Sequence, residues 1–214
     1  MKRFVARITL AATALVAVTA PTLARAQTFQ MTGAEPLPAG GHLVGGFIQS
    51  SENVLGLIGQ LRLSFYPGVD FGFNGGFARQ DYSGENHTTL RLGTDLKYQI
   101  LAPTEARPFT MSIGGALGIE TGDNYSLLNL GPTLVASRAF PSNGVSFTPY
   151  AGTGIMFNRF EAGDFSDTDV AFPLNIGSEV HINPQLTIVG ELQLRVSDSI
   201  NDDVGFGIGV NSSF

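Results

Sequence analysis

The sequence predicts an all-β fold: a closed, antiparallel, up-and-down transmembrane β-barrel, with 10 strands preferred and eight as the alternative. Two observations predict it. Apolar side chains recur at every second position along most of the chain, which is the period of a strand and not of a helix. The positions between them are mostly glycine, serine, threonine, alanine and asparagine. A sheet with one apolar face and one small, uncharged face is typical of a barrel that turns its apolar face to lipid.

Residues 1–26 match a secretory signal peptide. Three basic residues precede an apolar run at 8–20, and Ala24-Arg25-Ala26 is a small-x-small cleavage site. The run is 13 residues long, whereas a membrane-spanning helix needs about 20. We therefore expect an exported chain that begins at Gln27.

The composition excludes several classes of function. The chain has no cysteine, which excludes disulfides, thiolate catalysis and cysteine-ligated metals. Of its 12 basic residues, four leave with the signal peptide, whereas all 18 acidic residues remain, so the net charge of the exported chain is 8 − 18 = −10. That balance argues against nucleic acid as a partner.

The exported chain divides into a non-strand lead-in at 27–39, which contains Pro36 and Pro38, and a barrel at 40–214. The lead-in lies in the periplasm or enters the lumen of the barrel. Prolines at 132, 149 and 173 each remove one ladder hydrogen bond and predict local breaks. The expected strands are 42–50, 54–66, 70–79, 88–99, 108–120, 127–139, 146–158, 170–182, 186–197 and 203–214.

The connections between these strands form two alternating sets. One set is rich in proline and other turn formers: YPGVD (66–70), APTEARP (102–108), FPSNG (140–144) and NPQ (183–185). The other set is acidic and holds 12 of the 18 acids: SSEN (51–54), DYSGENH (81–87), ETGDN (120–124), EAGDFSDTD (161–169) and SDSINDD (197–203). Alternate connections of an up-and-down barrel lie at opposite ends, so one end should carry tight turns and the other acidic loops.

The composition of the small, polar face distinguishes a membrane barrel from a soluble one. A soluble barrel alternates too, with its apolar face turned inward, but a soluble surface is about a quarter to a third charged. Here 14% of the whole chain is charged, and most acids fall in connections. Glycines such as Gly205, Gly207 and Gly209 make a poor solvated exterior but a suitable lumen wall. We infer that the apolar face contacts lipid and that closure pairs every strand edge.

The segment TPYAGTGIMF at 148–157 is similar to the PYxGxG strand of small OmpA-like and porin-family barrel domains. Together with the signal peptide, the alternating strands and a terminal Phe214, it resembles the outer-membrane β-barrel proteins of Gram-negative bacteria, over nearly all of the exported chain. The resemblance implies a location in the outer membrane, among its lipids. It also implies that Phe214 is the assembly signal read by the barrel-assembly machinery. Small members of the family often have eight strands.

Strand parity places a set of long polar side chains inside the barrel. We expect the charged ones to pair across the lumen, opposite strands that contribute glycine, serine and alanine. Two interpretations follow: the network fills and closes the barrel, or it lines a narrow pore for ions or small solutes. The residues are Gln60, Arg62, Arg91, Asp95, Lys97, Glu179, His181, Glu191, Gln193 and Arg195.

The expected function is therefore non-enzymatic: a structural outer-membrane barrel, or one that passes ions or small solutes. A surface adhesin that uses the acidic loops is the alternative. An outer-membrane lipid hydrolase is disfavoured, because Ser178 and His181 lie on opposite faces of a regular strand and no G-x-S-x-G motif occurs. Asp164, Asp167 and Asp169 lack the spacing of an EF-hand loop, so we expect no metal site and no cofactor.

Overall fold

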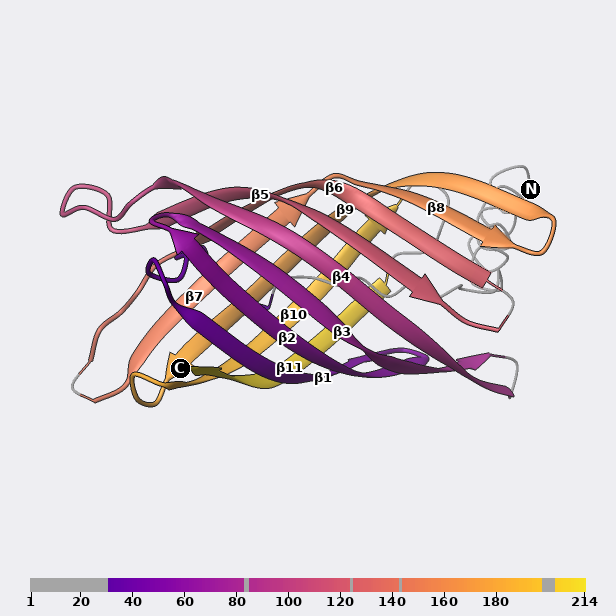
Figure 1. Ribbon diagram of the computed structural model, residues 1–214, viewed down its shortest axis with the longest axis horizontal. Helices are drawn as coiled ribbons and strands as arrows, with labels where there is room; N and C mark the ends of the chain where they lie inside the picture. Colours follow the sequence, from indigo (N-terminus) through magenta and orange to yellow (C-terminus); the bar gives the residue numbers. More distant parts are fainter. Residues whose placement is uncertain (1–30, 83–84, 124, 143, 198–202) are drawn as a thin grey trace, which may run out of the picture.

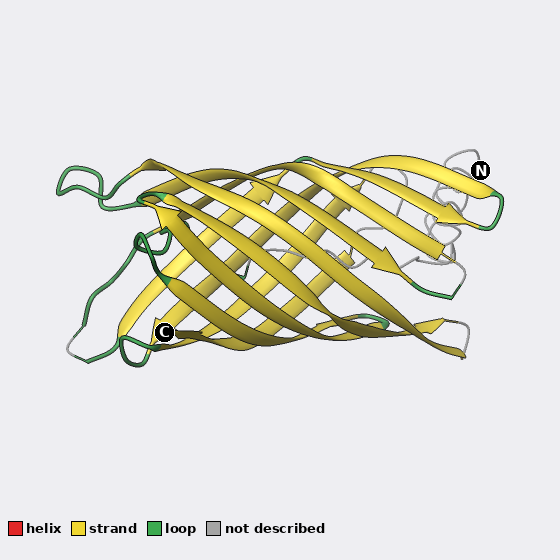
Figure 2. Cartoon of the chain, in the orientation of Figure 1, coloured by secondary structure: helices red, strands yellow, loops and turns green. Residues whose placement is uncertain are grey.

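The computed structural model describes residues 31–82, 85–123, 125–142, 144–197 and 203–214, and the predicted signal peptide lies outside them. The chain forms a single antiparallel barrel of tilted strands (Figures 1 and 2). In the described part, no helix is long and apolar enough to cross a membrane. The strands are β1 (His42–Ser51), β2 (Val54–Tyr66), β3 (Val69–Tyr82), β4 (Glu85–Leu101), β5 (Thr110–Thr121), β6 (Tyr125–Ser137), β7 (Ser146–Gly154), β8 (Met156–Ala162), β9 (Phe165–His181), β10 (Leu186–Ser197) and β11 (Asp203–Ser213).

The barrel closes because its first and last strands pair. β1 and β11 are antiparallel neighbours from Leu43↔Ser213 to Ser50↔Phe206. β7 and β8 follow one another between β6 and β9, so they occupy the place of one interrupted strand. The prediction of 10 strands in a closed up-and-down order is therefore confirmed. Each strand edge is paired, as hydrocarbon requires.

The interruption at Ile155 has a cause in the sequence. Pro132 of β6 and Pro173 of β9 flank this point on the two neighbouring strands, and a proline cannot donate to the ladder. The Ile155 amide donates to the Pro132 carbonyl oxygen at 3.1 Å, and the Thr153 hydroxyl donates to the Pro173 carbonyl oxygen at 2.9 Å. The registers on both sides of the break are continuous, so the inward and outward faces do not exchange. The third proline, Pro149, lies within β7 without a break.

The two sets of connections lie at opposite ends of the barrel, as predicted (Figure 1). We call them the proline end, on the left of Figure 1, and the acidic end, on the right. Parts of the acidic segments that we expected to be loops belong to strands. β8 and β9 run to Ala162 and from Phe165, pair directly, and leave a turn in which Gly163 has φ 57°.

The outward face of the barrel is apolar over most of its height, with charged side chains such as Arg159 and Glu161 facing outward near the acidic end. Large apolar side chains such as Leu57, Leu92 and Ile208 are 64%, 50% and 48% exposed, while their sequence neighbours are turned inward. A continuous apolar surface of this extent is not stable in water. The predicted orientation of the two faces is confirmed: the apolar stripe faces lipid and the small, polar stripe faces the lumen.

Aromatic side chains near the strand ends, among them Phe65, Tyr66, Tyr125, Phe160 and Phe214, predict interfacial girdles. Phe65, Tyr66 and Phe214 do point outward at the proline end. Tyr125 and Phe160 do not: their rings face the lumen near the acidic end, 5.8 Å apart. The expectation was wrong for these two because both fall on inward positions of strands that extend further than predicted.

Leu92→Arg tests the contact with lipid. Leu92 lies near the middle of β4 on the outer face, where a buried guanidinium should lower the free energy of unfolding by about 2–4 kcal/mol. Leu92→Phe is the matched control and should change it by less than about 1.5 kcal/mol. Denaturant titration in phospholipid vesicles, followed by circular dichroism, measures both. If Leu92→Arg had the same free energy of unfolding as the wild type, the outward orientation of Leu92 toward lipid would be contradicted.

Candidate functional site

The lumen holds the side chains that sequence parity assigned to it, from strands on all sides of the barrel. Most are nearly inaccessible, and Glu179, His181 and Gln193 are partly exposed. They do not form one continuous network. The structure divides them among local groups along the barrel axis. The fully buried ones are Gln60, Arg62, Arg91, Asp95, Lys97, Glu191 and Arg195.

The group nearest the proline end centres on Arg62. Its guanidinium donates two hydrogen bonds to Asp95, at 3.1 and 2.7 Å, and a third to Asp70. The Lys97 ammonium lies 3.4 Å from the other Asp70 oxygen. Gly72 makes room for the Arg62–Asp95 pair, because a Cβ there would lie 2.2 Å from the Asp95 carboxylate. Four buried charges thus neutralise one another with geometry that suits a guanidinium.

A second group lies toward the acidic end. Arg91 Nε is 3.1 Å from Glu120 Oε2. The other Glu120 oxygen accepts hydrogen bonds from Gln80, at 2.6 Å, and from the Tyr125 hydroxyl, at 2.6 Å. Arg195 pairs with Asp169 at 3.6 Å in a separate contact between β10 and β9. Glu120 and Asp169 were assigned to acidic loops, which is wrong: both are buried inside the barrel.

Glu191 and His181 lie apart from these ion pairs. Glu191 accepts hydrogen bonds from Tyr150, at 2.8 Å, and from Gln193, at 2.6 Å. His181 is near the proline end, where Nδ1 is 2.9 Å from Thr187 Oγ1 and Nε2 is 3.7 Å from Glu179 Oε2.

The lead-in enters the lumen from the proline end, which resolves the alternative left open by the sequence. Residues 31–34 are buried and belong to no strand. The wall holds this segment mainly through its backbone. Lys97 Nζ donates hydrogen bonds to Thr32 Oγ1, Gly33 O and Glu35 O, at 3.1, 2.9 and 3.3 Å, and the Ser112 hydroxyl donates one to Ala34 O at 2.5 Å. In the other direction, three backbone amides of the segment donate to side chains of the wall. The Gly33 amide donates to Glu179 at 2.8 Å, the Ala34 amide to Ser137 at 3.1 Å and the Leu37 amide to Asp70 at 3.2 Å.

The inner end of the segment has an apolar seat. Met31 packs in a buried cluster with Phe47 of β1, Tyr150 of β7 and Val189 of β10. Gly207 opens the wall for it, because a Cβ at that position would lie 1.9 Å from the Met31 methyl carbon. The cluster also explains why Phe47, rather than Ile48, turns inward on the first strand. A bound segment thus fills the middle of the barrel.

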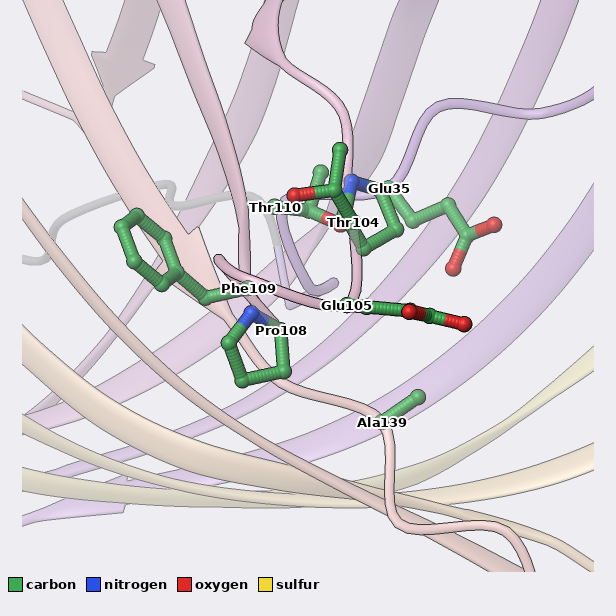
Figure 3. A pocket seen from close by; sticks show the side chains of 8 residues that line it. Glu35, Thr104, Glu105, Pro108, Phe109, Thr110 and Ala139 are labelled. Atoms are coloured by element: carbon green, nitrogen blue, oxygen red, sulfur yellow. The ribbon is translucent and has the colours of Figure 1, made fainter.

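Two hollows flank the segment where it passes the proline end. One, of about 310 Å³, lies between Glu35 and the β4–β5 connection, and Figure 3 shows the carboxylates of Glu35 and Glu105 pointing to the same side of it. The other, of about 470 Å³, lies between Glu35, the β6–β7 connection and His181. The segment is therefore tightly bound at 31–34 but loosely packed around Glu35.

Strand parity identifies some of the buried lumen residues that the sequence analysis did not assign to the lumen. Asp70 begins the inward series of β3, but we placed it at the edge of a turn, and Glu120 and Asp169 continue the inward series of β5 and β9. Asp70 and Glu120 already fall within the expected strands 70–79 and 108–120, and extending the expected strand 170–182 by one residue identifies Asp169. No comparable signal marks Met31 or Gly33 as lumen ligands, because the segment that carries them has no periodicity.

No protein-family model matches the sequence, and no curated protein matches it. Several solved structures resemble it in architecture, and three of these serve as examples. The β domain of the Bordetella autotransporter BrkA is 16% identical, with 82% of this chain and 100% of that chain covered and a TM-score of 0.48. An outer membrane channel from Pseudomonas putida F1 is 11% identical, with 87% of this chain and 100% of that chain covered and a TM-score of 0.47. The outer membrane protease OmpT from Escherichia coli is 8% identical, with 86% of this chain and 100% of that chain covered and a TM-score of 0.46.

These likenesses are too distant to assign a function. One of the three is a channel and another is a protease, and a shared barrel does not imply a shared activity. The closed sheet and its apolar exterior are what place this chain in the outer membrane, since lipid requires both and bacterial barrels of this construction occupy that membrane.

Asp70→Asn tests the group around Arg62. The change removes one charge from a carboxylate that serves Arg62, Lys97 and the Leu37 amide, so the free energy of unfolding should fall by about 3–5 kcal/mol. Glu161→Gln is the control, because it breaks the exposed Arg159–Glu161 pair, whose side chains are 63% and 48% exposed. Loss of that pair should cost at most about 1 kcal/mol. Equal effects in a denaturant titration would show that the buried group does not stabilise the barrel.

Proposed function

We propose that the protein is a non-enzymatic integral barrel of the outer membrane whose lumen is closed at rest, with a structural role in the envelope. One observation carries this proposal: the buried cations of the wall are paired with wall carboxylates, and Lys97 also binds the lead-in. A wide water-filled pore would leave such side chains hydrated and apart. Outer-membrane lipid is the partner of the exterior.

The arrangement of the lumen supports the non-enzymatic interpretation. Ser178 Oγ makes no hydrogen bond, and His181 contacts Thr148, Thr187 and Glu179 instead. Glu179 is itself engaged by the Gly33 amide at 2.8 Å. Ser178 is therefore not aligned with His181 as a nucleophile with its base, an alignment that nucleophilic catalysis needs. Among the described residues, no group of three or more potential ligands could hold a metal ion, and absence of a cofactor stays a prediction.

The adhesin alternative loses part of its basis. It relied on acidic loops, and two of the acids counted there, Glu120 and Asp169, lie inside the barrel. The described connections at the acidic end are also short, with β8 and β9 joined by Gly163 and Asp164 alone.

Phe214 keeps its proposed role as the signal for the barrel-assembly machinery. Its side chain is 75% exposed at the proline end. Its amide donates to the His42 carbonyl oxygen at 3.2 Å, and its ring stacks on His42 with centroids 5.6 Å apart. The last strand is thereby tied to the first while its aromatic end stays accessible.

A planar bilayer experiment tests the closed lumen. The folded chain that begins at Gln27 should insert without producing a steady conductance in 1 M KCl, a salt concentration of the order that screens charges beyond about 3 Å. Insertion is verified separately by protection of the barrel from protease in vesicles of the same lipid. Stable, ohmic current steps from the wild-type protein would contradict the proposed closed state.

A further inference from the structure

The lead-in is bound to the barrel as a ligand is bound, and not as part of its sheet. Residues 31–41 include no strand, so no ladder holds them. Their partners are separate side chains on β3, β4, β5, β6 and β9, namely Asp70, Lys97, Ser112, Ser137 and Glu179. Such contacts can be exchanged for water one by one. The barrel itself remains complete without the segment, since every strand is paired to its neighbours.

A fixed joint connects this segment to the first strand. Gly40 has φ +79°, a conformation that favours glycine, and Gly41 follows it. The Gly40 amide donates to the Ser64 carbonyl oxygen at 2.7 Å, and the Ser64 amide donates to the Gly41 carbonyl oxygen at 3.0 Å. Pro36 and Pro38 stiffen the chain just before the joint. The segment is thus an arm anchored at the proline end, with its other contacts inside the lumen.

The two hollows beside Glu35 give this arm room to move. Their volumes are about 310 and 470 Å³, and Glu35 lines both. The carboxylates of Glu35 and Glu105 face the same hollow (Figure 3). The hollows adjoin the outer part of the segment, while the contacts of Met31 and Gly33 hold its inner part.

Removal of the arm would uncover a charged passage. Side chains just fill an eight-stranded barrel, and a wider barrel leaves extra space; here residues 31–34 occupy the middle of that space. Four cations and six carboxylates of the described wall face inward, so the carboxylates exceed the cations by two. These are Arg62, Arg91, Lys97 and Arg195 with Asp70, Asp95, Glu120, Asp169, Glu179 and Glu191.

We propose that residues 31–37 are a removable plug, and that the lumen they leave conducts small cations. The proposal rests on the closed resting state proposed above and adds the means of opening it. In the open state the arm swings about Gly40 toward the proline end, and water replaces its backbone groups around Lys97 and Glu179. The excess of wall carboxylates then favours cations over anions.

Met31→Asp is the opening variant. It places a carboxylate in the apolar seat beside Tyr150, whose hydroxyl already bonds the Glu191 carboxylate. The fraction of time spent open in a planar bilayer should rise at least about tenfold, which corresponds to about 1.4 kcal/mol. The reversal potential in a KCl gradient should show a preference for K⁺. Met31→Leu, which keeps the seat apolar, should stay closed like the wild type.

A disulfide in the same full-length chain separates plug movement from damage to the barrel. A Cβ built on Gly33 lies 3.5 Å from the Ser137 Cβ, a separation that a disulfide spans. The chain has no native cysteine. We therefore add Gly33→Cys and Ser137→Cys to Met31→Asp. The reduced protein should conduct, the oxidised protein should be closed, and reduction should restore the current. Met31→Asp with Gly33→Cys alone should not respond to redox state.

The outcomes distinguish this inference from the proposed function. Current that is the same in reduced and oxidised protein would overturn the plug, whatever the wild type does. An absence of current from reduced, correctly inserted Met31→Asp protein would overturn the conducting state and leave the closed structural barrel standing. Steady current from the wild type would refute the closed resting state itself. A preference for Cl⁻ in the open variant would refute the assigned charge selectivity.

Discussion

One constraint governs this barrel: each charged side chain on its inward face must find a partner within a lumen whose middle is filled by residues 31–34. Asp70 shows how the constraint is met. Its two oxygens serve Arg62, Lys97 and the amide of Leu37, so one carboxylate joins two cations of the wall to the segment inside. An unpaired buried charge would cost several kcal/mol. The Asp70 carboxylate therefore takes part both in the ion pairs of the wall and in the binding of the lead-in.

The number of strands explains why a separate segment is needed. A ten-stranded sheet encloses more space than wall side chains of moderate size fill, and many inward positions here are glycine. Gly72 and Gly207 are small because a salt bridge and the Met31 side chain, respectively, come close to them. The lead-in supplies the missing volume at Met31 and the missing hydrogen-bonding groups at 32–37. Its backbone thus takes the place that ordered water or longer side chains would occupy.

The sequence was sufficient for the fold and for much of the lumen. Period-two alternation fixed the parity of each strand, and parity placed Arg62, Asp95 and Lys97 together inside. It failed at strand ends: Glu120, the last residue of an expected strand, was assigned to the loop that follows, and Asp169 lies one residue before its expected strand. Polar residues near strand ends carry no apolar marker. The position of the lead-in could not be predicted at all. Its contacts join backbone groups to side chains from five strands, and backbone groups are the same in every sequence.

The closed lumen requires that residues 31–37 lie inside the membrane-embedded barrel. Ala34 is fully buried and Ala39 is exposed, so cysteine at each position makes a matched pair in a cysteine-free chain. A bulky, hydrophilic maleimide should label Ala39→Cys rapidly in intact vesicles and Ala34→Cys slowly, with both reacting equally after unfolding. Equally rapid labelling of the two in the folded protein would show that the segment lies outside the lumen.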